Sequence, residues 1–255
     1  MNRALLDAVA EVSALAGAEA LKHFGTALDV ELKADGSPVT RADREAERTA
    51  RAWIEARFPG DGILGEELGE TRPEASRRWL VDPVDGTRAF VKGVPLWGTL
   101  VAVVEGERVI AGAACFPVTR ERIAAARGAG CWWNGVRSSV SGVGTLAEAT
   151  VLATDAGFRR TPDRATRWHA LAVRADTART WGDCFGYLLV ATGRAELMTD
   201  GLLSPWDAAA VQVLVEEAGG VFTDWRGRTT SFGDGAIATN AVLARELRAA
   251  LGVPE

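Results

Sequence analysis

Small and aliphatic residues recur at helical spacing near the N-terminus of the chain. One stripe consists of Leu5, Val9, Val12, Ala16 and Ala20, and a second of Ala46, Ala50, Trp53, Ile54 and Phe58. Each stripe would lie on one face of a helix and bury that face against a core. We therefore predict a helix over residues 3–24 and a second helix that ends at residues 59–60. Between them the pattern predicts a strand at residues 28–33 and a loop at residues 34–38.

Shorter apolar runs bounded by turn residues predict strands. The run from Trp79 to Val81 ends abruptly at residues 82–87, which is typical of a buried strand that opens into a functional turn. Runs at residues 99–104 and 109–116 are separated by four polar or glycine residues and predict a hairpin. The region therefore belongs to a large sheet.

The last third of the chain alternates helical and strand patterns. It predicts a helix at residues 208–218, a strand that starts at residues 221–225, and a final helix that Asn240 caps and that runs through Leu251. A glycine-rich stretch at residues 142–144 is the best candidate for a boundary between two halves.

The length of 255 residues allows one large domain or two fused halves. We predict an N-terminal α+β half over residues 1–140 and a C-terminal α/β half over residues 141–255, folded as one compact unit. Apolar residues make up 47% of the chain and charged residues 25%, so the chain can bury a sizeable core.

Charge and residue usage exclude several classes of function. The formal net charge of -5 provides no basic field for a nucleic acid, so we expect no nucleic-acid partner. Acidic residues interrupt the apolar N-terminal segment, so we expect no membrane association and a cytoplasmic location. The three cysteines are odd in number and widely spaced, which fits neither a disulfide framework nor a metal clip.

Several acidic residues lie beside apolar or turn-forming sequence instead of on solvated helix faces. They are Glu66, Glu67, Asp82, Asp85 and Asp207. Burial of such carboxylates is costly without a positive partner, and carboxylates that converge repel one another. A pair of hard divalent cations removes both costs, because Mg2+ prefers oxygen ligands and keeps waters and phosphate in its coordination shell.

The segment Asp82-Pro83-Val84-Asp85-Gly86-Thr87 suits this chemistry mechanically. Pro83 fixes one backbone torsion and Gly86 permits an unusual one, so that a tight turn could aim two carboxylates at one point. If a helix begins near Gly86 and Thr87, their N–H groups would favour a phosphate at the same point.

Each of these segments also has an ordinary structural explanation. An Asp-Pro-x-Asp-Gly turn occurs in many proteins, and paired glutamates usually lie on a solvated surface. Asp207 could simply cap the helix that begins there. Only the combination of the segments favours a functional site.

Four blocks in order resemble the inositol monophosphatase superfamily, and the similarity covers essentially the whole chain. The blocks are residues 33–43 (KADGSPVTRAD), 65–67 (GEE), 79–87 (WLVDPVDGT) and 205–220 (PWDAAAVQVLVEEAGG). The resemblance implies a layered α/β/α/β/α sandwich of the inositol monophosphatase and fructose-1,6-bisphosphatase type. It also implies Mg2+-dependent hydrolysis of a small phosphate monoester, inhibition by Li+, and a homodimer.

The same resemblance implies a set of metal ligands. Glu66, Asp82 and the backbone carbonyl of Val84 would hold one Mg2+, and Asp82, Asp85 and Asp207 would hold a second. Two or three ions per subunit are expected.

Further residues receive roles in the same way. Asp43 and Thr87, together with Glu66, would activate and orient a metal-bound water as the nucleophile. The N–H groups of Gly86 and Thr87 would bind the phosphate. Lys33 would lie in a mobile loop near a weaker third metal position.

Three further blocks resemble the histidinol-phosphatase branch of the superfamily. They lie at residues 95–100, 181–187 and 191–196. Asp183 and Asp200 would be substrate contacts, because acceptor-only carboxylates can pair with the amine and imidazole of histidinol phosphate. Alternatively, Asp183 bonds a local backbone group and Asp200 belongs to an exposed turn.

The expected reaction is hydrolysis of L-histidinol phosphate to L-histidinol and phosphate, a step of histidine biosynthesis. Within the enzyme class the alternative is an inositol-1-phosphate phosphatase or a broad sugar and nucleotide phosphatase. Outside that class the alternative is a scaffold or regulatory binding protein that keeps the fold.

Overall fold

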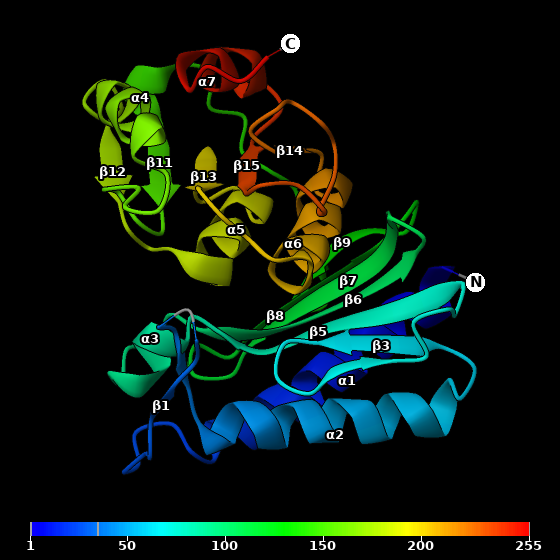
Figure 1. Cartoon of the computed structure of the whole chain (residues 1–255). Helices are drawn as coiled ribbons and strands as arrows, with labels where there is room; N and C mark the ends of the chain where they lie inside the picture. Colours follow the sequence, from blue (N-terminus) through cyan, green and yellow to red (C-terminus); the bar gives the residue numbers. More distant parts are fainter. Residues whose placement is uncertain (1, 35, 255) are drawn as a thin grey trace.

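The computed structural model describes residues 2–34 and 36–254, so Asp35 of the expected loop lies outside the described residues. Two long helices, α1 (Asn2–Leu21) and α2 (Arg41–Arg57), pack together on one face of a large sheet (Figure 1). The α1 residues Val9, Val12 and Ala16 are fully buried, as the helical spacing predicted.

Among the described residues, eight strands form the large sheet. In spatial order they are β10 (Val136–Arg137), β9 (Gly130–Trp133), β8 (Glu121–Ala126), β7 (Arg108–Phe116), β6 (Gly98–Glu105), β5 (Arg77–Asp85), β3 (Gly62–Gly65) and β4 (Gly69–Thr71). The hairpin predicted on either side of residues 105–108 is confirmed as β6 and β7. Strands β3 and β5 are parallel neighbours, which brings their C-terminal ends together.

A second sheet contains five of the described strands. In spatial order they are β12 (Thr177–Arg179), β11 (Thr150–Ala153), β13 (Leu197–Asp200), β15 (Ala236–Thr239) and β14 (Val221–Thr223). A one-turn 3-10 helix, η1 (Leu146–Glu148), precedes β11.

Helices α5 (Asp183–Ala191) and α6 (Pro205–Glu217) lie between the two sheets, and α4 (Pro162–Ala172) and α7 (Ala244–Ala250) cover the outer face of the smaller sheet (Figure 1). This is the expected α/β/α/β/α order of layers. The core between the sheets takes residues from both predicted halves, for example Leu80 and Leu188. A division near residue 140 stays a prediction. No helix in the described part of the chain is long and apolar enough to cross a membrane.

Near the N-terminus, two predicted elements are longer than the observed ones. Helix α1 ends at Leu21 and turns follow it, whereas the apolar pattern extended to residue 24. The strand expected at residues 28–33 is only β1 (Glu31–Leu32), which pairs with β2 (Pro38–Val39). Both β1 residues are exposed, so no core burial favours a longer strand.

The prediction of a tight turn at residues 82–87 is wrong, because strand β5 continues to Asp85. Its pairing with β6 shifts register between Asp82 and Asp85, and the buried Thr99 hydroxyl donates a hydrogen bond to the Pro83 carbonyl at 2.7 Å. Proline has no N–H to donate to a strand ladder, and it is tolerated here because the pairing is irregular at this position. The two aspartates therefore project from a bulged strand end.

The helix boundary at the C-terminus also differs from the prediction. Asn240 does not cap α7, which begins at Ala244 after Leu243. Instead Asn240 is buried, accepts a hydrogen bond from the Leu243 amide at 3.0 Å and donates one to the Val143 carbonyl at 2.8 Å. Its long-range partner gives Asn240 a different role from that of a local cap.

Candidate metal and phosphate site

Three acidic side chains meet where β5 ends and α6 begins. Asp82, Asp85 and Asp207 each offer a carboxylate oxygen, and these oxygens lie within 4.8 Å of one another. Asp82 is buried and the other two are half-buried. The structure thus brings together three acids that are up to 125 positions apart in the chain.

Asp207 both caps α6 and belongs to the acidic cluster. It is the third residue of the helix, and its Oδ2 accepts a hydrogen bond from the Ser204 amide at 2.9 Å in a capping box. The helix N-terminus carries partial positive charge, which favours carboxylates at this end. The capping explanation and the site explanation are therefore compatible.

Asp85 is fixed by the start of the neighbouring helix. Its Oδ2 accepts a hydrogen bond from the backbone amide of Cys184, the second residue of α5. Asp82 accepts one from the Val84 amide at 3.0 Å. The N-termini of α5 and α6 both face the cluster, so backbone dipoles favour negative charge there.

The cluster is electrostatically unfavourable when all three acids are ionised. Removal from solvent, and then the charge of Asp207, raise the pKa of Asp85 to about 8. Removal from solvent and the charge of Glu66 raise the pKa of Asp207 to about 7, and the pKa of Asp82 is raised well above its usual range by the same causes. A bound divalent cation would offset this repulsion, so the donor set fits a hard metal ion.

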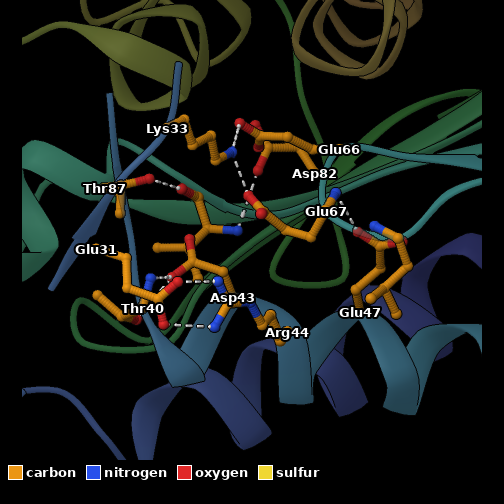
Figure 2. A network of polar contacts seen from close by, with 12 residues as sticks. Glu31, Lys33, Thr40, Asp43, Arg44, Glu47, Glu66, Glu67, Asp82 and Thr87 are labelled. Carbon is orange, nitrogen blue, oxygen red and sulfur yellow. Dashed lines mark hydrogen bonds and ion pairs between the residues drawn. The ribbon is translucent and has the colours of Figure 1, made fainter. Parts of the chain in front are cut away.

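Glu66 approaches this cluster from the adjacent strand but is paired with a lysine. Gly65 lies opposite Val81 in the β3–β5 ladder, so Glu66 follows beside Asp82. Lys33 Nζ donates to Glu66 Oε1 at 2.7 Å and forms an ion pair with Glu67 as well (Figure 2).

These contacts perturb both partners of the Lys33–Glu67 ion pair. Burial opposes the charge on Lys33, but the two glutamates outweigh it and raise the pKa of the ammonium. Burial raises the pKa of Glu67 to about 7. A cationic side chain thus already neutralises the glutamates of the β3–β4 connection, which indicates that this position favours positive charge.

Asp43 is held at the first turn of α2 with one oxygen left free. Thr40 donates to Asp43 Oδ2 through its amide at 2.8 Å and through its hydroxyl at 2.6 Å (Figure 2). The buried Oδ1 has no hydrogen-bond partner among the described residues. Burial is also the main cause that raises the pKa of Asp43. A buried oxygen without a partner is costly unless a ligand or water uses it.

The turn after β5 supplies backbone donors. Gly86 has a φ of +86°, and a Cβ there would lie 2.9 Å from the Leu96 carbonyl oxygen, so the position requires glycine. Helix α3 (Thr87–Val91) begins directly after it, and its first amides have no partner within the helix. The Thr87 hydroxyl donates to the Val84 carbonyl at 2.9 Å.

Asp183 and Asp200 line one cavity of about 430 Å³ beside this turn, together with Arg88 and Thr154. The Asp183 amide donates to the Thr154 hydroxyl at 2.7 Å, whereas Asp183 Oδ2 faces Gly86, 3.3 Å from where a Cβ would be. Burial and the charges of neighbouring aspartates raise the pKa of Asp183. This bond joins the Asp183 backbone to a side chain 29 positions away, not to a local backbone group as the alternative supposed, and it leaves the carboxylate in the cavity.

Asp200 is not part of an exposed turn. It is the buried last residue of β13, and its Oδ2 accepts a hydrogen bond from the Tyr187 hydroxyl at 2.9 Å. Burial raises the pKa of Asp200 to about 6. Its carboxylate therefore forms part of the cavity wall through a buried network.

Sequence reasoning missed Glu47, Arg88, Thr154 and Tyr187. Glu47 follows Asp43 by four positions on α2, which places both on one helix face, and that spacing was a usable signal. Arg88 directly follows Thr87 in the chain. No local pattern marks Thr154 or Tyr187, because only the tertiary fold brings them to the cavity.

Comparison with known proteins places the chain among phosphatases. A model of the inositol monophosphatase family matches residues 1–252. A histidinol-phosphatase of Chlorobaculum parvum is 43% identical over 245 residues, which are 95% of this chain and 94% of the relative. An inositol-1-monophosphatase of Mesorhizobium japonicum is 32% identical over 258 residues, which are 98% of this chain and 97% of the relative.

A solved structure agrees with these sequence matches. An inositol monophosphatase from Zymomonas mobilis superposes with a TM-score of 0.87 at 31% identity and covers 98% of both chains. These likenesses define a phosphoric monoester hydrolase. The chain belongs to the inositol monophosphatase family, which is metal-dependent, and its described residues include an acidic cluster that could bind a metal.

Proposed function

We propose that the chain hydrolyses L-histidinol phosphate to L-histidinol and phosphate, as a step of histidine biosynthesis. The observation that carries the proposal is the cavity in which the carboxylates of Asp183 and Asp200 lie beside the Gly86 turn. The substrate has a cationic amine and an imidazole, so charge-assisted hydrogen bonds to carboxylates would favour it over a neutral polyol. Relatives named histidinol-phosphatase at 34–43% identity support the choice.

We infer that the cation is Mg2+, with two or three ions per subunit. Glu66, Asp82 and the Val84 carbonyl would hold one ion, and Asp82, Asp85 and Asp207 a second. All of these are hard oxygen donors, which suit Mg2+ better than a softer metal. When bound there, Mg2+ supplies a Lewis acid that activates water and neutralises charge on the attacking and leaving oxygens.

The residues of the chain orient the reactants. The Thr40 amide and hydroxyl fix Asp43, so Oδ1 is free to accept a hydrogen bond from the attacking water. The Thr87 hydroxyl lies at the same end of β5 and would help to align that water. The amides of Gly86 and Thr87 would bind phosphoryl oxygens at the start of α3.

The reaction needs no covalent enzyme intermediate. The water oxygen forms a new bond to phosphorus, the bond from phosphorus to the ester oxygen breaks, and the leaving alcohol gains a proton. Lys33 would have to release Glu66 before that carboxylate binds a cation, because one side chain oxygen now accepts its hydrogen bond. The predicted mobility of the Lys33 loop fits this requirement.

A second candidate is phosphatase activity on inositol 1-phosphate or on other sugar and nucleotide phosphates. Arg88 lines the same cavity, and its positive charge would suit a second anionic group on a substrate. Comparison of phosphate release from histidinol phosphate, inositol 1-phosphate and adenosine 3',5'-bisphosphate at equal enzyme concentration tests the choice. Histidinol phosphate should be hydrolysed fastest, and a preference for either other substrate would reject the assignment.

We also infer that the chain forms a homodimer, on the basis of its family. Light scattering of the purified protein would test this directly. A mass near 54 kDa, twice the 27.0 kDa of the chain, is expected, and a monomer mass would contradict it.

A further inference from the structure

Glu47 is a fully buried acid on α2 that the proposed reaction does not use directly. Its Oε2 accepts a hydrogen bond from the Glu67 amide at 2.7 Å, and its Oε1 accepts one from the Leu68 amide at 3.2 Å. Figure 2 shows this side chain reaching up from the helix to the backbone beside Glu66 and Glu67. Glu47 thus contacts the main chain directly after the metal ligand Glu66.

Arg51 extends the same contact one helical turn farther along α2. Its Nε donates to Glu47 Oε1 at 2.7 Å, and its guanidinium also donates to the Thr71 hydroxyl at 2.8 Å and to the Gly69 carbonyl. The pair compensates the buried charge of Glu47 and anchors the β4 strand of the hairpin to α2.

Gly65, the residue directly before Glu66, completes the contact. A Cβ on Gly65 would lie 1.9 Å from Glu47 Oε1, which no side chain could tolerate without displacing the glutamate. The Glu47 carboxylate therefore packs against the backbone that precedes Glu66 and bonds the backbone that follows it.

We propose that Glu47 is a positioning residue that sets the direction of the Glu66 carboxylate toward Asp82. The buried Glu47 carboxylate holds the backbone on both sides of Glu66. Glu66 is therefore already ordered in the folded protein, and cation binding does not have to supply the conformational entropy that its ordering costs. The inference rests on the proposed role of Glu66 as a metal ligand. Glu47 itself does not touch the cation or the substrate.

The chain offers a matched control at the opposite end of the same strand. Asp61 precedes β3, is buried, and accepts hydrogen bonds from Arg77 at 2.8 and 3.0 Å and from Trp79 Nε1 at 2.8 Å. It is also a buried acid paired with an arginine, but it lies at the end of β3 away from Glu66. Loss of its charge should cost stability without affecting the cation.

The experiment measures Mn2+ binding by electron paramagnetic resonance and Mg2+ binding by calorimetry in wild type, Glu47→Gln and Asp61→Asn. In Glu47→Gln the side-chain NH2 group would replace one carboxylate oxygen and would face the backbone N–H of Glu67 or Leu68, which is also a donor. One hydrogen bond that holds the backbone after Glu66 is then lost, so we expect the affinity for one ion to fall about 10- to 100-fold. Asp61→Asn should lower the melting temperature but leave both affinities within about twofold of wild type. High Mg2+ should restore much of the kcat of Glu47→Gln, because the ligand itself is still present.

Unchanged affinity in Glu47→Gln, or an equal loss in both variants, would overturn the inference. Absence of cation binding in the wild type would instead reject the proposed metal site, so the two failures are distinguishable. If Glu47→Gln does not fold, Arg51→Lys provides the same test, because it keeps the charge and loses the fork that holds Glu47. Arg51→Lys should lower the affinity for one ion at least about threefold, and an affinity equal to that of the wild type would contradict the positioning role of Glu47.

A double-mutant cycle tests the direct contact. Gly65→Ala alone should displace Glu47 and weaken cation affinity, whereas in a Glu47→Ala background the same change should add little, because the clashing atom is gone. Fully additive losses would show that the two residues act independently, which would contradict the proposed contact.

Discussion

Acids beside the two ends of β5 lie in opposite electrostatic surroundings. At the N-terminal end, Asp61 faces Arg77 and the Trp79 indole, so its oxygens accept hydrogen bonds from three donors. At the C-terminal end, Asp82 and Asp85 face Asp207, and burial together with the repulsion between the acids raises their pKa values. The first arrangement is complete within the fold, whereas the second requires a proton or a cation from outside.

The contrast separates an acid that stabilises the fold from acids that we propose bind a ligand. Both groups are carboxylates on or next to one strand, and both are largely removed from water. Only the presence or absence of a cationic partner distinguishes them. Substitutions at the two ends should therefore have opposite effects on activity and on stability.

The largest expected effect is loss of activity in Asp85→Asn. The change removes a predicted ligand charge, so kcat/KM should fall by about three orders of magnitude or more. The melting temperature without Mg2+ should stay the same or rise, because one repulsive charge is gone. Asp61→Asn is the control and should keep most activity while losing about 1–3 kcal/mol of unfolding free energy. Near-normal activity in Asp85→Asn would remove the basis for the contrast.

The pH dependence of stability should sharpen the same contrast. A carboxyl with a raised pKa in the folded state contributes stability at low pH that is lost as pH rises through that pKa. Without Mg2+, Asp207 and Asp85 should therefore lower the free energy of unfolding between about pH 4 and pH 8, where the upper limit follows the pKa values of about 7 and about 8. The total effect should be on the order of a few kcal/mol.

Chemical denaturation of wild type and Asp207→Asn across this pH range measures that effect. The variant should lose less stability toward pH 8 than the wild type, because it has one titrating group fewer in the cluster. Identical pH profiles for the two proteins would contradict the raised pKa of Asp207.

Addition of Mg2+ should reverse the destabilisation at the C-terminal end of β5. At 100 times its dissociation constant, a ligand that binds only the folded state adds about 2.7 kcal/mol of stability. Thermal unfolding at pH 8 with Mg2+ and with a chelator should show this gain in the wild type and in Asp61→Asn, and a clearly smaller gain in Asp85→Asn, which keeps only the proposed ion site that does not use Asp85. An equal gain in all three proteins would point to a cation site elsewhere.

The smallest expected effect concerns substrate selectivity. Asp183→Ala should lower kcat/KM for histidinol phosphate about tenfold more than for inositol 1-phosphate, because it removes one charge-assisted partner of a cationic substrate. Asp155 lines the same cavity but accepts hydrogen bonds from Arg159, so Asp155→Ala is the matched control. Equal losses on both substrates in Asp183→Ala would count against its substrate role.

Sequence patterns were most informative where chemistry is encoded locally. The spacing of Asp82, Asp85, Gly86 and Thr87 already linked carboxylates to a glycine and a helix start, and the structure has both a positive φ at Gly86 and α3 after it. The layer order was implied by resemblance and is confirmed by the two sheets and their helices. The glycine turn and the helix start depend on one short segment, whose conformation follows from its own residues.

Features that depend on distant partners could not be predicted. The bulge at Pro83 depends on Thr99 of the next strand, and the role of Asn240 depends on Val143. Tyr187 joins Asp200 only because α5 packs on β13. A single sequence does not show such contacts, because the partners are separated by loops whose paths it leaves undetermined.

The most direct test is anomalous diffraction from crystals of the protein grown with Mn2+ in place of Mg2+. We expect one peak among Asp82, Asp85 and Asp207 and a second between Glu66 and Asp82, with Lys33 displaced from Glu66. Crystals that contain Mn2+ elsewhere but show no peak at these carboxylates would contradict the account.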